Sequence, residues 1–262
     1  MLKKTLIAAA VPCAFIASLA SASPMAPGVV YTDATGDIAS GIATGNGTLD
    51  LVSMEVSSTA TDVIFKLTIN GNVGAPPTYE GGTDWGKFMI GISTGAGDTA
   101  TNGNGWSRPI NMTSNGGMTR WVGSWVDGGG GAEVYAFGSG AWNRTGATWD
   151  GGAPFPGSLA IAAGAQSTLT YTVSMASLGV SNGSTIYFDA YSSGGGGGDS
   201  AVDALSRSDA SISNWGGPFT TAGIAAGTSA STAGGAFAYT IPAPGALALL
   251  GAASLVGSRR RR

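Results

Sequence analysis

Tryptophans are the side chains in this chain with the clearest capacity for binding, because an aromatic face can stack on a sugar ring. On a strand, residues four apart lie on one face about 13 Å apart, so Trp121 and Trp125 could form a platform. Nearby arginines could donate hydrogen bonds to sugar hydroxyls. The candidate sugar-binding set is Trp106, Trp121, Trp125, Trp142, Trp149 and Arg108, with Arg120 and Arg144 as further donors. Core packing is the alternative use of the same rings.

Catalytic groups are few. The chain contains no histidine, which excludes Ser-His-Asp and Cys-His catalysis and removes the commonest transition-metal ligand. A glycosidase needs two carboxyl groups roughly 5 to 10 Å apart across a sugar. The acids that could supply them are Glu55, Glu80, Glu133, Asp84 and Asp150. No spacing selects a pair, and strand or turn positions explain these acids better, so we predict a non-enzymatic protein with no catalytic residue and leave a hydrolase as the third alternative.

A glycine-rich loop carries Asp98, Asn102 and Asn104, whose oxygens could be ligands for calcium. Their spacing is not that of an EF-hand loop, which needs ligands at alternate positions and a glutamate at the twelfth. Ordinary turn formation explains the same residues. The only cysteine, Cys13, lies near the N-terminus, outside the part expected to fold. We therefore assign no metal ligand and no cofactor.

The N-terminus has the pattern of a secretory signal peptide. Lys3 and Lys4 precede an apolar stretch over residues 5–20, expected to be helical, and the small residues Ala20 and Ala22 mark a cleavage site. We predict that residues 1–22 direct export and are removed after Ala22.

The C-terminal tail has three parts in a fixed order. The sequence Pro242-Ala243-Pro244 precedes an uncharged run over residues 245–258. No polar stripe interrupts this run, which predicts a transmembrane helix, although it is shorter than the roughly 20 residues of a full span. Four arginines that should stay in the cytoplasm close the chain: Arg259, Arg260, Arg261 and Arg262. The prolines disfavour helix and predict an extended segment open to a processing enzyme.

This layout resembles the sorting signal of PEP-CTERM proteins, in which a Pro-Glu-Pro motif precedes a membrane span and an arginine cluster. The resemblance implies processing by an exosortase-type membrane protease near residues 242–244. Ala243 stands where the family usually has Glu, so the motif looks like a Pro-Ala-Pro variant of the signal. A single-pass tail anchor without processing is the alternative.

The net charge of the part between the two ends limits the partners that it can bind. Outside the two ends, 6 basic residues face 15 acidic ones, a net charge of −9. Such a surface repels phosphate backbones, so nucleic acid is not expected as a partner. The 45 glycines and the few charged residues favour a secreted β-protein with long loops.

Alternating apolar residues predict the scaffold that must position these side chains. In the clearest strand, residues 61–69, four apolar residues share one side: Val63, Phe65, Leu67 and Ile69. Further strands are expected at 48–56 (with a register shift), 85–92, 118–126, 132–137, 167–175 and 185–191, and one helical turn at 176–179. We predict an all-β antiparallel sandwich over residues 23–221, a Gly/Ala/Thr linker over 222–240 and the sorting signal over 241–262.

The opening of this region looks like extracellular modules of the DOMON and family-nine carbohydrate-binding type, over about a quarter of the chain. The likeness rests on Thr35-Gly36-Asp37, Leu49-Asp50-Leu51, residues 61–67 and Asp84-Trp85-Gly86-Lys87. It implies a jelly-roll-like fold and sugar binding, and no ligand residue is carried over. The sequence thus predicts an exported cell-surface or matrix protein. The alternative is a polysaccharide-binding module at the same location.

Overall fold

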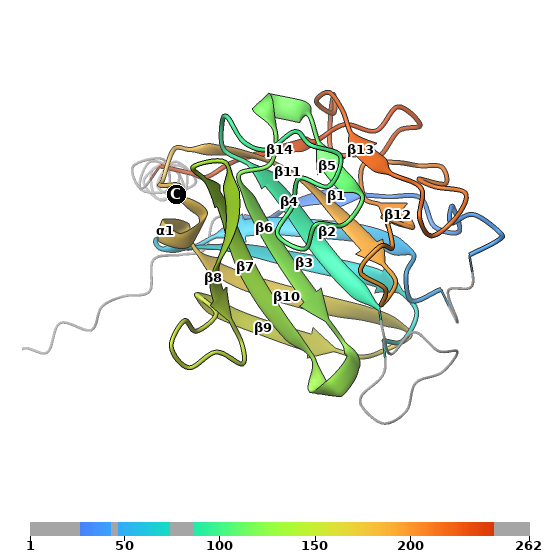
Figure 1. Ribbon diagram of the computed structural model, residues 1–262, viewed down its shortest axis with the longest axis horizontal. Coiled ribbons are helices and arrows are strands. Elements are labelled where there is room, and N and C mark those ends of the chain that lie inside the picture. The colour runs from blue at the N-terminus through green and yellow to red at the C-terminus, as the bar shows by residue number, and fades with distance from the viewer. Residues whose placement is uncertain (1–26, 43–46, 74–85, 244–262) are drawn as a thin grey trace, which may run out of the picture.

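The computed structural model describes residues 27–42, 47–73 and 86–243, and these form two antiparallel sheets packed face to face (Figure 1). The expected signal peptide, Pro244, the apolar run and the arginine cluster lie outside the described residues. Within these ranges, no helix is long and apolar enough to cross a membrane. The expectation of an all-β antiparallel sandwich is confirmed.

The first sheet has five strands in the order β1-β2-β3-β10-β9. Their bounds are β1 (Val29–Thr32), β2 (Leu51–Ser58), β3 (Asp62–Asn70), β10 (Gln166–Ser174) and β9 (Gly157–Ala162). All four predicted core residues of β3 are fully buried, because strand alternation turns them to one face. The register shift expected in β2 lies between Leu51 and Ser53.

The second sheet runs β12-β11-β4-β6-β7-β8, and β14 pairs with β11 beside β12. Its strands are β4 (Lys87–Ser93), β6 (Arg120–Trp125), β7 (Gly131–Gly138), β8 (Ala141–Ala147), β11 (Thr185–Ser193), β12 (Asp203–Ala204) and β14 (Phe237–Thr240). The expected hairpin of β6 and β7 is present.

Short elements connect and cover the sheets. A parallel pair is formed by β5 (Ile110–Met112) and β13 (Phe219–Thr221), and 3-10 turns lie at η2 (Ser114–Gly116) and η3 (Asp127–Gly129). The predicted helical turn is α1 (Met175–Leu178). The Ser174 side chain caps its N-terminus, and Gly179 ends it in the left-handed conformation that favours glycine.

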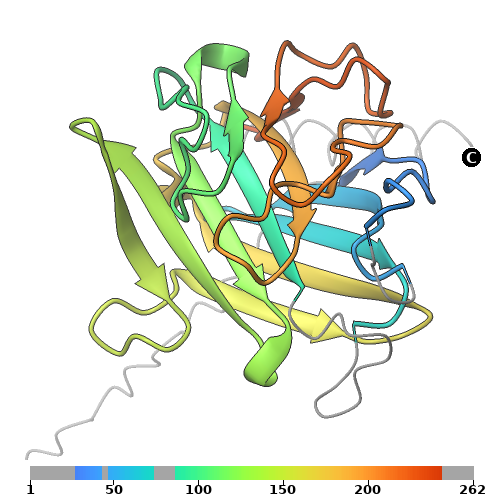
Figure 2. The ribbon, with the colours of Figure 1, turned by 45° about the vertical axis from the view of Figure 1, so that its right-hand side comes forward.

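The main core lies between the sheets. Phe188 of β11 lies edge-on to Tyr31 of β1, with ring centroids 4.9 Å apart, and 6.0 Å from Phe65 of β3. A hydrogen bond of 2.7 Å also crosses the interface, between the hydroxyls of Ser124 in β6 and Tyr171 in β10. The opposite face of the second sheet is covered by loops drawn in green and orange in Figure 2.

Residues 222–240 differ from the predicted linker because they belong to the folded part. Ala236 and Phe237 are fully buried, and β14 pairs with β11. Upstream, the backbone of Thr32 donates to Thr228 (2.8 Å) and accepts from Ala230 (2.9 Å). Backbone hydrogen bonds hold the first part of this segment, where small side chains carry little periodic signal, whereas Phe237 and Tyr239 alternate into the core in β14.

Candidate functional site

The predicted platform on β6 is largely covered. Trp121 and Trp125 share the outer face of the second sheet, but Trp121 is fully buried and Trp125 is half-buried. Tyr191 stacks on Trp121 at 6.1 Å between ring centroids, and Trp106 meets it edge-on at 6.2 Å. Trp121 therefore packs in a second core outside the sandwich, which is the alternative considered from the sequence.

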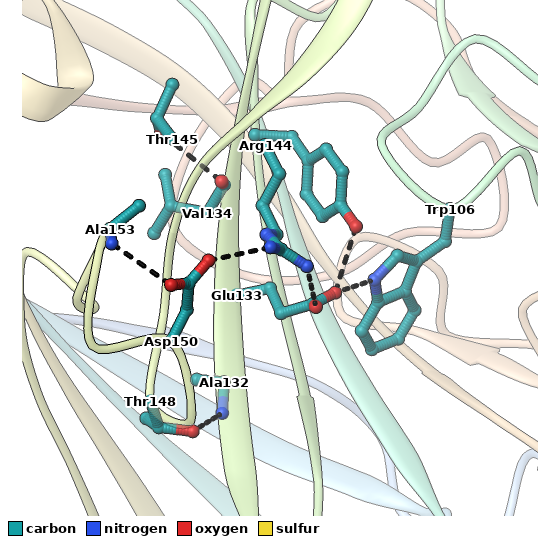
Figure 3. Close-up of polar contacts among 10 residues, drawn as sticks. Trp106, Ala132, Glu133, Val134, Arg144, Thr145, Thr148, Asp150 and Ala153 are labelled. Carbon is teal, nitrogen blue, oxygen red and sulfur yellow. Dashed lines mark hydrogen bonds and ion pairs between the residues drawn. The ribbon is translucent and has the colours of Figure 1, made fainter.

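Trp106 is held by a polar network on the same face. Its indole Nε1 donates to Glu133 Oε2 at 2.8 Å, and the Tyr135 hydroxyl donates to the same oxygen at 3.0 Å (Figure 3). Arg144 approaches the other oxygen of Glu133 at 3.5 Å. The Trp106 ring lies directly on Gly123 of β6, where a Cβ would overlap the ring. Glu133 is thus a structural anchor for the ring.

Arg108 is buried, and its guanidinium forms hydrogen bonds inside the protein. It is 4% exposed, and its Nη1 donates to Ser193 Oγ (2.7 Å) and to the Asp199 carbonyl (3.1 Å). The guanidinium lies 5.5 Å from the centre of the Trp106 ring. Burial lowers the pKa of Arg108, while the charge of Asp199 opposes that shift. Its donors tie the covering loops to the sheet.

Trp142 and Trp149 differ in exposure. Trp142 lies in β8, which is not among the strands expected from the sequence, and its Nε1 donates to Asp98 Oδ2 at 2.9 Å. Trp149, in the turn after β8, is 59% exposed. The Arg144 guanidinium lies 4.2 Å above the Trp149 ring. It also donates to Asp150 at 2.8 Å (Figure 3). Of the predicted sugar-binding set, Trp149 is the ring that faces solvent.

In the loop of Asp98, Asn102 and Asn104, the side chains of Asp98 and Asn104 form internal hydrogen bonds, and Asn102 is exposed. Asn104 is fully buried; its Nδ2 donates to the carbonyls of Arg108 and Ile110, at 2.8 and 2.7 Å. Asp98 Oδ1 accepts from the backbone of Ala100, and its Oδ2 accepts from the Trp142 ring. These bonds agree with turn formation, the simpler of the two interpretations of this loop.

An open hollow of about 500 Å³ lies beside a tryptophan outside the predicted set. Gly195, Gly196, Asp199 and Trp215 line it. Asp199 Oδ2 accepts from the backbone of Gly196 at 2.8 Å, which fixes the glycine run. A Cβ at Gly194 would lie 2.8 Å from the Trp215 ring, so the close approach requires glycine. In the sequence, no pattern links Trp215 to Asp199.

An acidic cluster is the second feature that the sequence did not reveal. Asp33 and Asp37 lie in the turn after β1, and Asp203 lies in β12. One carboxylate oxygen from each is within 4.8 Å of the other two. Asp33 and Asp37 have an ordinary turn pattern, and only folding brings Asp203 beside them.

Burial makes this cluster electrostatically unfavourable. It raises the pKa of Asp33 to about 10 and that of Asp37 to about 6, and raises the pKa of Asp203 well above its usual value. Neighbouring carboxylates add to each shift. Two negative charges at this separation repel by about 3 to 4 kcal/mol at an effective dielectric constant of about 20. Hard cations with oxygen ligands, such as calcium, suit this donor set.

The expected processing motif begins where the sandwich ends. Ile241 is fully buried; its backbone N–H donates to Ser184 (2.9 Å) and its carbonyl accepts from Gly183 (2.8 Å). Pro242 is half-buried and Ala243 is exposed. Ala20 and Ala22 at the expected signal cleavage site lie outside the described residues, as do Pro244 and the terminal arginines.

Comparison with models of known protein families finds no match, and comparison with curated protein sequences finds none either. Function must therefore be inferred from the residues of this chain.

Proposed function

We propose that the chain is a non-enzymatic exported protein that is held in the membrane by its C-terminal helix and then processed by an exosortase-type protease. Its final location is the cell surface or the extracellular matrix. The observation that carries this proposal is the position of Pro242 and Ala243, directly after the last buried residue of the sandwich, Ile241. Proteases cut exposed segments outside the fold, and the exposure of Ala243 supports the proposal.

The short connection favours a protease within the membrane. Only residues 242–244 separate Ile241 from the expected span. Three extended residues reach at most about 11 Å, so the sandwich would lie against the bilayer surface. A soluble protease would have little room there, whereas a membrane-embedded one reaches the segment from the side.

Mass spectrometry of the protein from its native cells tests the proposal. We expect a mature N-terminus at Ser23 and a new C-terminus at or near residues 242–244. Replacing all four terminal arginines by glutamine should reduce membrane retention and processing, and replacing them by lysine should preserve both. A cytosolic protein with Met1 and Arg262 intact would contradict export.

The unprocessed tail anchor makes a different prediction. In cells that lack the exosortase-type protease, the processed protein should be replaced by a membrane-bound form with an intact tail. The double variant Pro242→Ala, Pro244→Ala should accumulate the same form in normal cells. An intact tail in normal wild-type cells would support the plain anchor instead.

The second candidate function is polysaccharide binding, which the hollow at Trp215 and Asp199 favours. A ring beside a carboxylate combines stacking with hydrogen-bond acceptance, a pairing suited to sugars. The resemblance to jelly-roll-like carbohydrate-binding modules supports the same interpretation. The exposed ring of Trp149, beside Arg144, is the alternative surface.

Retention of the full-length protein on immobilised surface polysaccharides tests this candidate. If the hollow binds sugar, Trp215→Ala should weaken retention about fivefold to tenfold, and Trp149→Ala should leave it unchanged. The reverse result would place binding at the turn after β8. Absence of retention for the wild type would end the candidate.

A further inference from the structure

We propose that the carboxylates of Asp33, Asp37 and Asp203, with Asp50 beside them, bind one calcium ion that joins the two sheets at the edge of the sandwich. This site is independent of the exported role and of sugar binding. No metal ligand was expected here from the sequence.

The cluster bridges elements of both sheets. Asp33 follows β1 and Asp50 precedes β2 in the five-stranded sheet, whereas Asp203 lies in β12 of the other sheet. The loop after β1, in blue, and β12, in orange, lie at the same side of the molecule in both ribbon views (Figures 1 and 2). The Leu51 backbone N–H of β2 donates to Asp203 Oδ2 at 2.6 Å, which links the sheets next to the cluster. A cation here would reinforce that link.

Unsatisfied oxygens point to a missing partner. Asp33 Oδ2, Asp50 Oδ1 and both carboxylate oxygens of Asp37 are shielded from solvent and have no hydrogen-bond partner within the described part of the chain. Buried polar atoms are nearly always paired, so several orphaned oxygens in one place indicate an absent ion or water.

Asp50 gives an observation independent of the three clustered carboxylates. It is 4% exposed, and its Oδ2 accepts from the backbone of Gly36 (2.9 Å) and from Asn70 Nδ2 (2.8 Å). These bonds hold the carboxylate against the turn that carries Asp37. Its charge raises the pKa of both Asp37 and Asp203, so it lies within electrostatic reach of each. Asp50, whose Oδ1 is shielded from solvent and unpaired among the described residues, therefore flanks the three clustered carboxylates.

Ligand chemistry selects calcium. The site offers only oxygen donors, whereas zinc prefers nitrogen and sulfur. Calcium accepts 6 to 8 oxygens in flexible geometry, including carboxylates from separate segments, backbone carbonyls and water. Magnesium requires nearly ideal octahedral geometry and gives up its water reluctantly. An ion with charge +2 would offset the repulsion among carboxylates that otherwise share a buried space.

Thermal unfolding of the full-length protein tests the site. The purified protein is stripped with EGTA and melted with and without added calcium. Calcium at about 100 times its Kd should raise Tm by about 5 to 10 °C, because it binds only the folded state. Calorimetric titration should give one calcium per chain.

Asp37→Asn is the diagnostic variant because both carboxylate oxygens of Asp37 are shielded from solvent and accept no hydrogen bond from any other described residue. It should abolish the calcium response. In EGTA its Tm should equal or exceed that of the wild type, since one buried negative charge is removed. Asp127→Asn, which changes a partly exposed acid paired with Lys87 on another part of the molecule, should keep the full calcium response.

The outcomes separate clearly. Unchanged Tm and no binding heat for the wild type would overturn the proposal, even if Asp37→Asn failed to fold. Retained calcium binding in a folded Asp37→Asn variant would overturn this location. A response to magnesium without one to calcium would overturn the choice of ion.

Discussion

The two faces of the seven-stranded sheet are packed in different ways, and consecutive residues of β11 show it. Phe188 points into the sandwich, where its ring meets Tyr31 and Phe65. Asp189 points to the other face, where it is fully buried and accepts hydrogen bonds from the hydroxyls of Ser206 (2.8 Å) and Thr221 (2.6 Å). The inner face is held mainly by apolar rings, and the outer face by aromatic rings together with loops that hydrogen-bond to it.

This difference between the two faces shows how a glycine-rich chain forms two buried layers, one between the sheets and one on the outer face of the second sheet. Between the sheets, strand alternation alone brings large side chains together. On the outer face, the Trp106 ring lies against Gly123 of β6, where a Cβ would overlap it, so the covering loop approaches the sheet closely. The stability of the inner layer should therefore depend on side-chain volume. The stability of the outer layer should depend on the room that glycines leave beside the strands and on the protonation of buried carboxylates.

The largest effect is expected from the inner face. Phe188→Ala removes a ring that contacts both sheets and should lower the free energy of unfolding by about 3 to 5 kcal/mol. Urea unfolding measures the loss. Phe137→Ala, at a half-buried position in β7, is the matched control and should cost clearly less. Equal losses would show that the inter-sheet core is not the dominant layer.

The outer face should respond to pH. Burial raises the pKa of Asp189 to about 7, which is above its value in the unfolded chain, so the folded state holds its proton more tightly. Stability from this group is complete below about pH 4 and declines as pH rises through about 7. Urea unfolding across this range should show a smaller decline in Asp189→Asn than in the wild type. Parallel curves would contradict the raised pKa.

The next largest loss of stability is expected where a side chain is added at a glycine that contacts a ring. In Gly123→Ala the new methyl group overlaps the Trp106 ring, which should cost about 1 to 3 kcal/mol and alter tryptophan fluorescence. Gly138→Ala is the control, because no described atom lies within 4 Å of a Cβ there, and it should stay within about 0.5 kcal/mol of the wild type. A harmless Gly123→Ala would mean that the covering loop shifts freely.

The smallest effect is expected at the rim of the outer layer. Arg144 pairs with Glu133 and Asp150 through a side chain that is 32% exposed. Exposed ion pairs contribute little, so Arg144→Gln should cost about 0 to 1 kcal/mol. Unfolding in low and high salt should show that the difference shrinks with screening. A loss above about 2 kcal/mol would make this network a structural centre of the outer face.

The inner layer could be predicted from the sequence because its signals are local. The alternation at residues 61–69 and 167–175 became β3 and β10 with nearly the same bounds. The capped helical turn at α1 also follows from adjacent residues, with Ser174 before it and Gly179 after it. In these segments the local sequence pattern indicates which residues are buried.

The outer layer and the acidic cluster could not be predicted, because they depend on residues far apart in sequence. Alternation correctly placed Trp121 and Trp125 on one face, but it could not show that loops would cover Trp121. Asp33 and Asp203 are far apart in the sequence and come together only in the folded structure. Residues 222–236 look like a linker because backbone bonds, which leave no side-chain pattern, hold them in place. The alternation of Phe237 and Tyr239 in β14 is a local signal, but it spans only four residues.

The attachment of the tail to β14 has a mechanical consequence. A pull on residues beyond Ile241 would load first the backbone bonds at Ile241 and then the pairing of Phe237–Thr240 with β11. Under such a pull, β14 would detach from β11 before the rest of the sandwich unfolds. A cut after Ile241 would remove the load and leave that strand in place.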